Sequence, residues 1–140
     1  MKKNLTDEDG PYIELMTEVY SDNQPDFTWL KPYEEKTFEQ YFMPYKQLGE
    51  VKKASKDVLL NLEIEEKSSK NKVELAVYTT SLFENLKIIL RTAEDLLFEK
   101  KVNVAPEKVY QTEVETEQEI FRAEHILEVF SATGELLLEY

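Results

Sequence analysis

The chain has 140 residues, of which 41% are hydrophobic and 33% are charged, and its formal net charge at pH 7 is −12. This length suits one domain with an unassisted core, and the apolar content argues against global disorder. The absence of cysteine excludes disulfides, thiolate zinc sites and cysteine nucleophiles. The first nine residues lack the apolar stretch of a signal peptide, and no apolar run could form a transmembrane helix. We therefore expect one cytoplasmic domain, 1–140, with residues 1–9 as a flexible tail.

The negative charge lies mainly at the two ends of the sequence. Residues 1–45 carry 4 basic and 10 acidic side chains, residues 46–101 carry 11 and 10, and residues 102–140 carry 2 and 9. A field of this sign repels phosphate backbones and anionic lipids, so we expect no direct binding to nucleic acid or membranes. The acidity favours either a partner protein with a basic surface or solubility alone.

Two segments in the first third of the chain favour short amphipathic helices. Residues 11–20 place apolar side chains at helical spacing behind Pro11, which suits a first helical position, although a strand also fits this segment. Residues 37–45 repeat the helical spacing with aromatic side chains, and Pro44 must end or kink that helix. The aromatic residues at helical spacing are Phe38, Tyr41, Phe42 and Tyr45.

The middle of the chain gives the clearest pattern. Apolar and polar residues alternate over 57–66 and again over 72–80, and the polar loop between these runs predicts an antiparallel hairpin. Residues 81–101 predict a long helix, because Ser81 and Glu84 fit a capping box and a leucine-rich stripe at helical spacing follows. Lys100 and Lys101 would complement the dipole at its C-terminal end.

Strand patterns return after Pro106. Residues 108–116, 119–130 and 135–140 predict three strands, and a turn at 131–134 joins the last two. A helix over 117–130 is the alternative. The predicted fold is therefore α+β, with an antiparallel sheet of about five strands packed on the long helix and on the shorter N-terminal helices.

The sequence offers no conventional active site. Gly10, Gly49 and Gly134 lie too far apart to form a phosphate-binding loop. The single histidine, His125, lies on a mostly apolar face of a predicted strand, without an identifiable nucleophile or orienting carboxylate. We therefore expect no enzymatic activity, no cofactor and no metal site.

Two groups of residues are candidates for binding a partner protein. Glutamates recur at every second position from 113 to 119, a pattern typical of a solvated strand face that could also offer an acidic ladder to a basic groove. The loop-like segment 27–33 carries aromatic residues, which are common interface anchors when they lie on a surface. The candidate partner-binding residues are Trp29, Tyr33, Glu113, Glu115, Glu117 and Glu119.

These observations favour a non-enzymatic, acidic protein-binding domain. Inhibitors, immunity proteins and DNA-mimicking phage proteins offer an analogy of size and charge only. One alternative is a small-ligand or enzymatic pocket between the sheet and the helices, lined by Tyr78, Tyr110 and His125. The other is a phage or secretion assembly protein that acts as a homo-oligomer.

Overall fold

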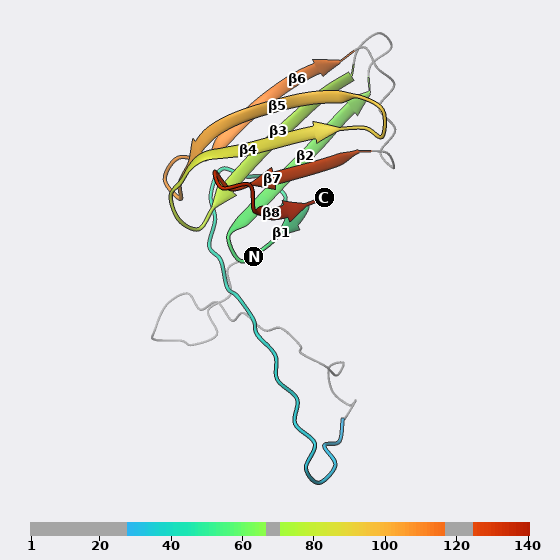
Figure 1. Cartoon of the computed structure of the whole chain (residues 1–140), viewed down its shortest axis with the longest axis vertical. Coiled ribbons are helices and arrows are strands. Elements are labelled where there is room, and N and C mark those ends of the chain that lie inside the picture. Colours follow the sequence, from blue (N-terminus) through green and yellow to red (C-terminus); the bar gives the residue numbers. More distant parts are fainter. Residues whose placement is uncertain (1–27, 67–70, 117–124) are drawn as a thin grey trace, which may run out of the picture. The chain divides into compact units, whose positions relative to one another are not determined.

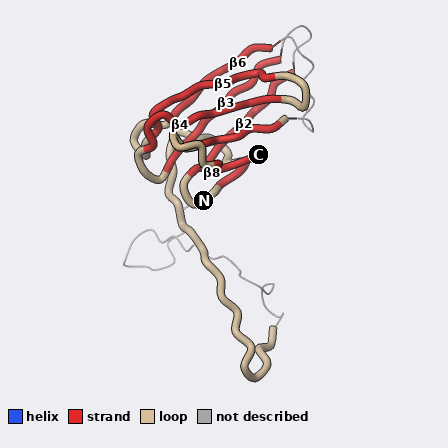
Figure 2. The backbone as a smooth tube through the Cα atoms, in the orientation of Figure 1, coloured by secondary structure: helices blue, strands red, loops and turns tan. Residues whose placement is uncertain are grey.

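The computed structural model describes residues 28–66, 71–116 and 125–140, and all the regular elements in these ranges are β-strands (Figures 1 and 2). The chain divides into two units, residues 1–40 and residues 41–140. In the first unit, the described residues from 28 onward form neither helix nor strand. The described residues of the second unit form two antiparallel sheets of four strands each. The described part of the chain contains no helix long and apolar enough to cross a membrane.

The first sheet has the strand order β1-β2-β3-β6. β2 and β3 form the predicted hairpin, in which Val58 lies opposite Thr79 and Glu66 lies opposite Asn71. β6 then pairs with the other side of β3, and the two-residue strand β1 pairs with the beginning of β2. The strands of this sheet are β1 (Lys53–Ala54), β2 (Val58–Glu66), β3 (Asn71–Thr79) and β6 (Tyr110–Thr116).

The second sheet has the strand order β5-β4-β7-β8. The predicted turn at 131–134 joins β7 to β8: Ser131 N–H donates to Glu135 O at 2.8 Å, and Gly134 has a φ of 87°. At the other side, the Ala105–Lys108 turn carries the chain from β5 back to β6 of the first sheet. The strands of the second sheet are β4 (Phe83–Arg91), β5 (Leu96–Val104), β7 (Ile126–Phe130) and β8 (Leu136–Glu139).

The two sheets pack face to face on one apolar core. Alternate residues of each strand point inward, as a strand period of two requires, and fully burying one such side chain stabilises the fold by roughly 1.5–3 kcal/mol. The buried members of this core are Val58, Leu60, Leu62, Val73, Leu75, Val77, Leu86, Ile88, Leu90, Val104, Leu127, Val129 and Leu138.

A second, smaller apolar cluster lies on the outer face of the first sheet. Residues 43–51, which we call the covering segment, cross this face and bury Leu48 against Leu59, Ala76 and Tyr78. The Tyr78 hydroxyl donates to Pro44 O at 3.1 Å. The covering segment therefore protects only one part of this face, and it leaves the remainder to polar side chains.

The long helix predicted over 81–101 is wrong, because this stretch forms β4, a turn and β5. Asn85 has a φ of 53°, which a helix interior does not allow, and its N–H donates to Asn103 Oδ1 at 2.8 Å. Thr92 Oγ1 accepts the N–H groups of Glu94 and Asp95, which closes the turn between the two strands. The α+β fold class is therefore wrong for the described residues, which form an all-β sandwich.

The other predicted elements have mixed outcomes. The helix predicted over 37–45 is wrong, because these residues form no regular element and Met43 instead packs on the outer face of the first sheet as part of the covering segment. The predicted strands 108–116 and 135–140 correspond to β6 and β8, and the end of the predicted strand 119–130 corresponds to β7. Residues 11–20 and 117–124 lie outside the described residues. β1 was not predicted.

Candidate functional site

The outer face of the first sheet carries polar side chains in rows across three strands. Alternation places the residues between the core positions on this face, and the register then aligns them. One row is Asn61, Ala76 and Gln111, the next is Glu63, Glu74 and Glu113, and the third is Glu65, Lys72 and Glu115. We call the five glutamates of the last two rows the acidic face: Glu63, Glu65, Glu74, Glu113 and Glu115.

Two lysines form ion pairs with glutamates of the acidic face. Lys72 Nζ lies 2.6 Å from Glu74 Oε1 and 2.8 Å from Glu113 Oε2. Hydrogen bonds, first to Glu113 and then to Glu74, raise the pKa of Lys72. Lys52 Nζ lies 2.7 Å from Glu50 and 3.0 Å from Glu63, and these hydrogen bonds raise the pKa of Lys52.

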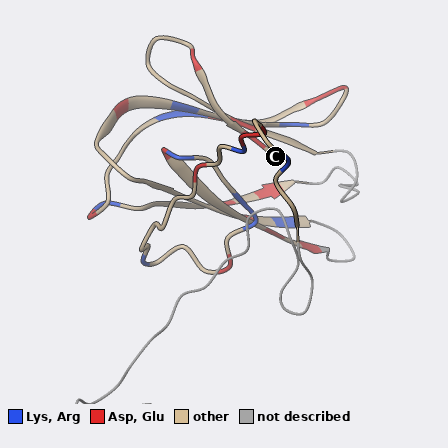
Figure 3. Ribbon diagram, turned by 90° about the horizontal axis from the view of Figure 1, so that it is seen from below, with Lys and Arg blue, Asp and Glu red and all other residues tan. Residues whose placement is uncertain are grey.

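The acidic face is nevertheless rich in acidic side chains. The two rows that form it hold five glutamates and one lysine, Lys72, although acidic and basic positions are scattered over strands and loops of the sandwich (Figure 3). Glutamates directly opposite one another on neighbouring strands destabilise a sheet, since strands lie only about 4.8 Å apart. Lys52 and Lys72 lie against this row with side chains only 24% and 25% exposed, and they offset part of that repulsion. The row of Glu63, Glu74 and Glu113 still brings three like charges together across neighbouring strands.

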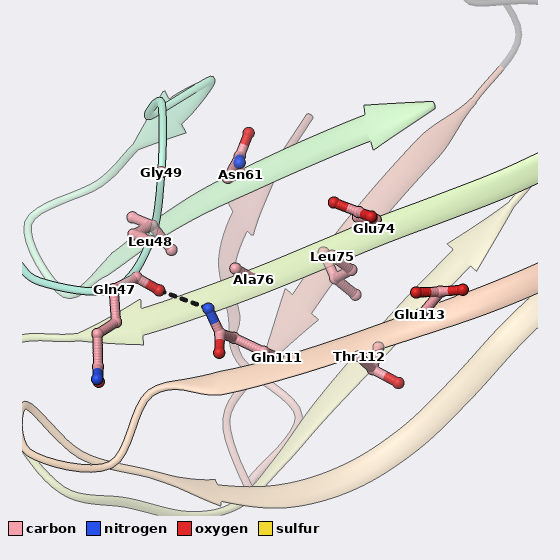
Figure 4. Close-up of a pocket in the computed structure, with 10 residues that line it drawn as sticks. All are labelled: Gln47, Leu48, Gly49, Asn61, Glu74, Leu75, Ala76, Gln111, Thr112 and Glu113. Carbon is pink, nitrogen blue, oxygen red and sulfur yellow. Dashed lines mark hydrogen bonds between the residues drawn. The ribbon is translucent and has the colours of Figure 1, made fainter. Parts of the chain in front are cut away.

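A hollow of about 570 Å³ lies between the covering segment and this glutamate row (Figure 4). Ala76 occupies the middle of its floor, where a small side chain leaves room. The Gln111 side chain points toward the covering segment and donates to Gln47 O at 2.8 Å. Glu74 and Glu113 supply acceptors only, whereas the amide and hydroxyl side chains of the lining both donate and accept, so the glutamate side of the hollow suits a positively charged group. They are Gln47, Leu48, Gly49, Asn61, Glu74, Leu75, Ala76, Gln111, Thr112 and Glu113.

A second hollow, of about 410 Å³, lies beside the edge of β2. Leu62 and Ile64 reach it from β2, while His125 and Tyr140 reach it from the ends of β7 and β8. Lys52 and Glu63 complete its lining. In residues 28–66, 71–116 and 125–140, no three acidic or histidine side chains come together as metal ligands would.

The structure describes only two of the four glutamates of the predicted acidic ladder. Glu113 and Glu115 lie on the acidic face, exposed to solvent, whereas Glu117 and Glu119 fall outside the described residues. Sequence reasoning missed Glu63 and Glu74: the hairpin register places Glu63 opposite Glu74, and the pairing of β3 with β6 places Glu74 opposite Glu113. The signal for Glu63 and Glu74 was available, because pairing 57–66 with 72–80 already places them opposite one another.

Trp29 lies just before a tight turn of the first unit, and Tyr33 lies within that turn. Glu34 N–H donates to Lys31 O at 2.9 Å, and Lys31 N–H donates to Glu34 Oε2 at 2.9 Å. Tyr33 has a φ of 67°, a conformation that favours glycine at this position of a turn. Trp29 is 85% exposed and Tyr33 is fully exposed. The turn therefore presents both aromatic rings to solvent.

The residues predicted to line a ligand pocket do not come together. Tyr78 is buried beneath the covering segment, Tyr110 packs against the main core, and His125 lines the second hollow. A pocket between sheet and helices has no counterpart in the described residues, because they contain no helix.

Comparison with known proteins identifies the family. Residues 53–140 match the family model described as "YphG-like protein, second domain". The match covers more than half of the chain and includes every strand from β1 to β8, so the chain belongs to this family. No solved structure matches the chain.

Proposed function

We propose that this chain is a protein-binding domain whose acidic face docks on a basic surface of a partner protein. The observation that carries the proposal is the row of Glu63, Glu74 and Glu113, aligned across three neighbouring strands on an exposed sheet face. Like charges side by side repel one another, and Lys52 and Lys72 offset that repulsion in part. Cationic groups of a partner would relieve the remainder, which gives the row a role in binding.

The geometry of the site supports the same function. The hollow beside the row offers room for a lysine or arginine side chain next to Glu74 and Glu113. Charge of this kind speeds association and fixes orientation more than it raises affinity. The first unit separately exposes the rings of Trp29 and Tyr33, and apolar anchors of this kind usually carry more of the affinity.

The test compares two sets of three charge substitutions. In the first variant, E63Q/E74Q/E113Q removes the row, and in the matched control E84Q/E94Q/E107Q removes three exposed glutamates elsewhere. A partner is first captured by crosslinking in cells of the source organism, and its binding to the purified full chain is then measured at two salt concentrations. We expect the row variant to associate about tenfold more slowly at low salt and to lose most of its salt dependence.

Two results would contradict the proposal. If both triple variants slow association equally, the effect comes from net charge and not from the acidic face. If the wild-type association rate does not change with salt, the partner surface is not recognised through charge. In either case the acidic face is only a solvated sheet surface.

A further inference from the structure

Among the described residues, β2 has no neighbouring strand on one edge beyond its short contact with β1. β1 pairs only with Leu59 and Leu60. Ser55 N–H donates to Val58 O at 2.8 Å, and Lys52 N–H donates to Leu60 O at 2.9 Å. Main-chain groups point to alternate sides along a strand. The N–H and C=O groups of Leu62 and Ile64 therefore point away from β3, as those of Val58 and Leu60 do.

The covering segment does not continue along this edge of β2. The residues that precede Lys52 in the chain do not follow this edge, because their backbone crosses the outer face of the sheet. Gly49, with a φ of 77°, and Gln47, with a φ of 54°, make this change of direction. Leu48 is then buried against the sheet. Within the described residues, no strand pairs with β2 on this side beyond Leu60, so Leu62 and Ile64 present their main-chain groups outward.

The surroundings of this edge suit an added strand with a definite pattern. Inward-facing side chains of such a strand would enter the hollow of about 410 Å³ beside Leu62 and Ile64. Tyr140 forms one wall and is held by two main-chain bonds with Leu127, at 2.8 and 2.9 Å. Outward-facing side chains would lie next to Glu63 and Glu65 of the acidic face. The edge therefore matches an extended chain in which apolar and basic residues alternate.

We propose that the edge of β2 over residues 61–65 binds an extended segment of a partner protein by strand addition, and that this segment alternates apolar and basic side chains. The inference rests on the proposed function, because it continues the acidic face by one strand. Hydrogen bonds between main chains would provide affinity, and the alternate side chains would provide specificity.

Hydrogen exchange on the ¹⁵N-labelled full chain tests the edge directly. The probe is the acetylated, amidated peptide Lys-Val-Lys-Val-Lys-Val-Lys, and its control is Lys-Lys-Val-Val-Val-Lys-Lys, which has the same composition. In the free chain we expect fast exchange at Leu62 and Ile64 and slow exchange at Asn61 and Glu63, which face β3. When about nine tenths of the chain is bound, exchange at Leu62 and Ile64 should fall about tenfold. The control peptide should give no such protection.

Methylation of the probe peptide separates strand addition from charge attraction. In an antiparallel addition, the valine N–H groups face β2 and the lysine N–H groups face away. N-methylation of the three valines should abolish protection, and N-methylation of three lysines should preserve it. The proposal is overturned if both methylated peptides still protect Leu62 and Ile64, or if neither of them does. Concentration-dependent protection without peptide would also overturn it, because a second copy of this chain would then be the occupant.

Two variants of the chain complete the test. Ile64→Pro removes an edge N–H without removing a β2–β3 bond, and E63Q/E65Q removes the neighbouring charge. Both should weaken peptide binding at least about tenfold, whereas E84Q should not. Should Ile64→Pro not fold, the charge variant alone decides the outcome. If the peptide leaves Leu62 and Ile64 unprotected while the row variant E63Q/E74Q/E113Q still loses its partner, strand addition is wrong and the proposed function stands.

Discussion

Gly49→Ala is expected to destabilise the sandwich through two separable effects. Gly49 has a φ of +77°, and a Cβ added there would lie 2.8 Å from Nδ2 of Asn61. A left-handed conformation costs an L-residue about 1–2 kcal/mol. The contact with Asn61 must also be relieved, by rotation of its amide or by lifting of the covering segment. We therefore expect the free energy of unfolding to fall by about 2–3 kcal/mol.

Gly134→Ala is the matched control for the conformational effect alone. Gly134 has a φ of +87°, and a Cβ added there would meet no atom within 4 Å. Its substitution should cost only about 1–2 kcal/mol. The difference between the two substitutions then measures the contact with Asn61, and Asn61→Ala should remove that difference in the double variant G49A/N61A.

Urea denaturation followed by far-UV circular dichroism measures these free energies. The spectroscopic probe must report on the sheets, since the only tryptophan of the chain, Trp29, lies in the first unit. If Gly49→Ala costs no more than Gly134→Ala, the covering segment does not pack on Asn61 as described. If the excess cost persists in the Asn61→Ala background, another contact must account for it.

Three further predictions concern other contacts of the chain. Tyr78→Phe should cost about 1 kcal/mol in urea denaturation, because it removes the half-buried hydrogen bond to Pro44 O; an unchanged midpoint would contradict this. Hydrogen bonding and charge from Lys52 lower the pKa of Glu50, so this pair stabilises the fold above pH 4.5, and its contribution is lost as the pH falls through the lower pKa of the folded state. Lys52→Met should therefore flatten the dependence of stability on pH in this range, and an unaltered profile would refute the assignment. Acrylamide should quench Trp29 as efficiently in the folded chain as in urea, and protection in the folded chain would show that the ring is covered.

The sequence predicted strands correctly where apolar and polar residues alternated clearly. The prediction was wrong where the same spacing of apolar residues fitted both a helix and a strand. Leu86 and Leu90 lie four residues apart, which suits a helix face, but four is also an even number, so both lie on one face of a strand with Ile88 between them. Asn85 and Thr92 carried the opposing signal, because Asn tolerates a left-handed conformation and Thr closes turns. The leucine stripe obscured it.

The N-terminal aromatic residues could not be placed from spacing alone. Helical spacing over 37–45 predicted a helix, yet the structure uses this stretch to reach the outer face of the sheet. The decisive contacts are tertiary: Leu48 buries itself against Leu59, Ala76 and Tyr78, which come from two other strands. Local propensity contains no information about such contacts, and it was therefore overridden.

The acidic face shows the same limit for function. Alternation placed Glu113 and Glu115 on one strand face, and the hairpin register would have added Glu63 opposite Glu74. The pairing of β3 with β6 could not be deduced, because consecutive strands usually pair, whereas here the chain first builds β4 and β5 in the other sheet. Only this crossover brings Glu113 beside Glu74. The charged row on which the proposed function depends therefore belongs to the topology of the sandwich, and no single segment of the sequence could predict it.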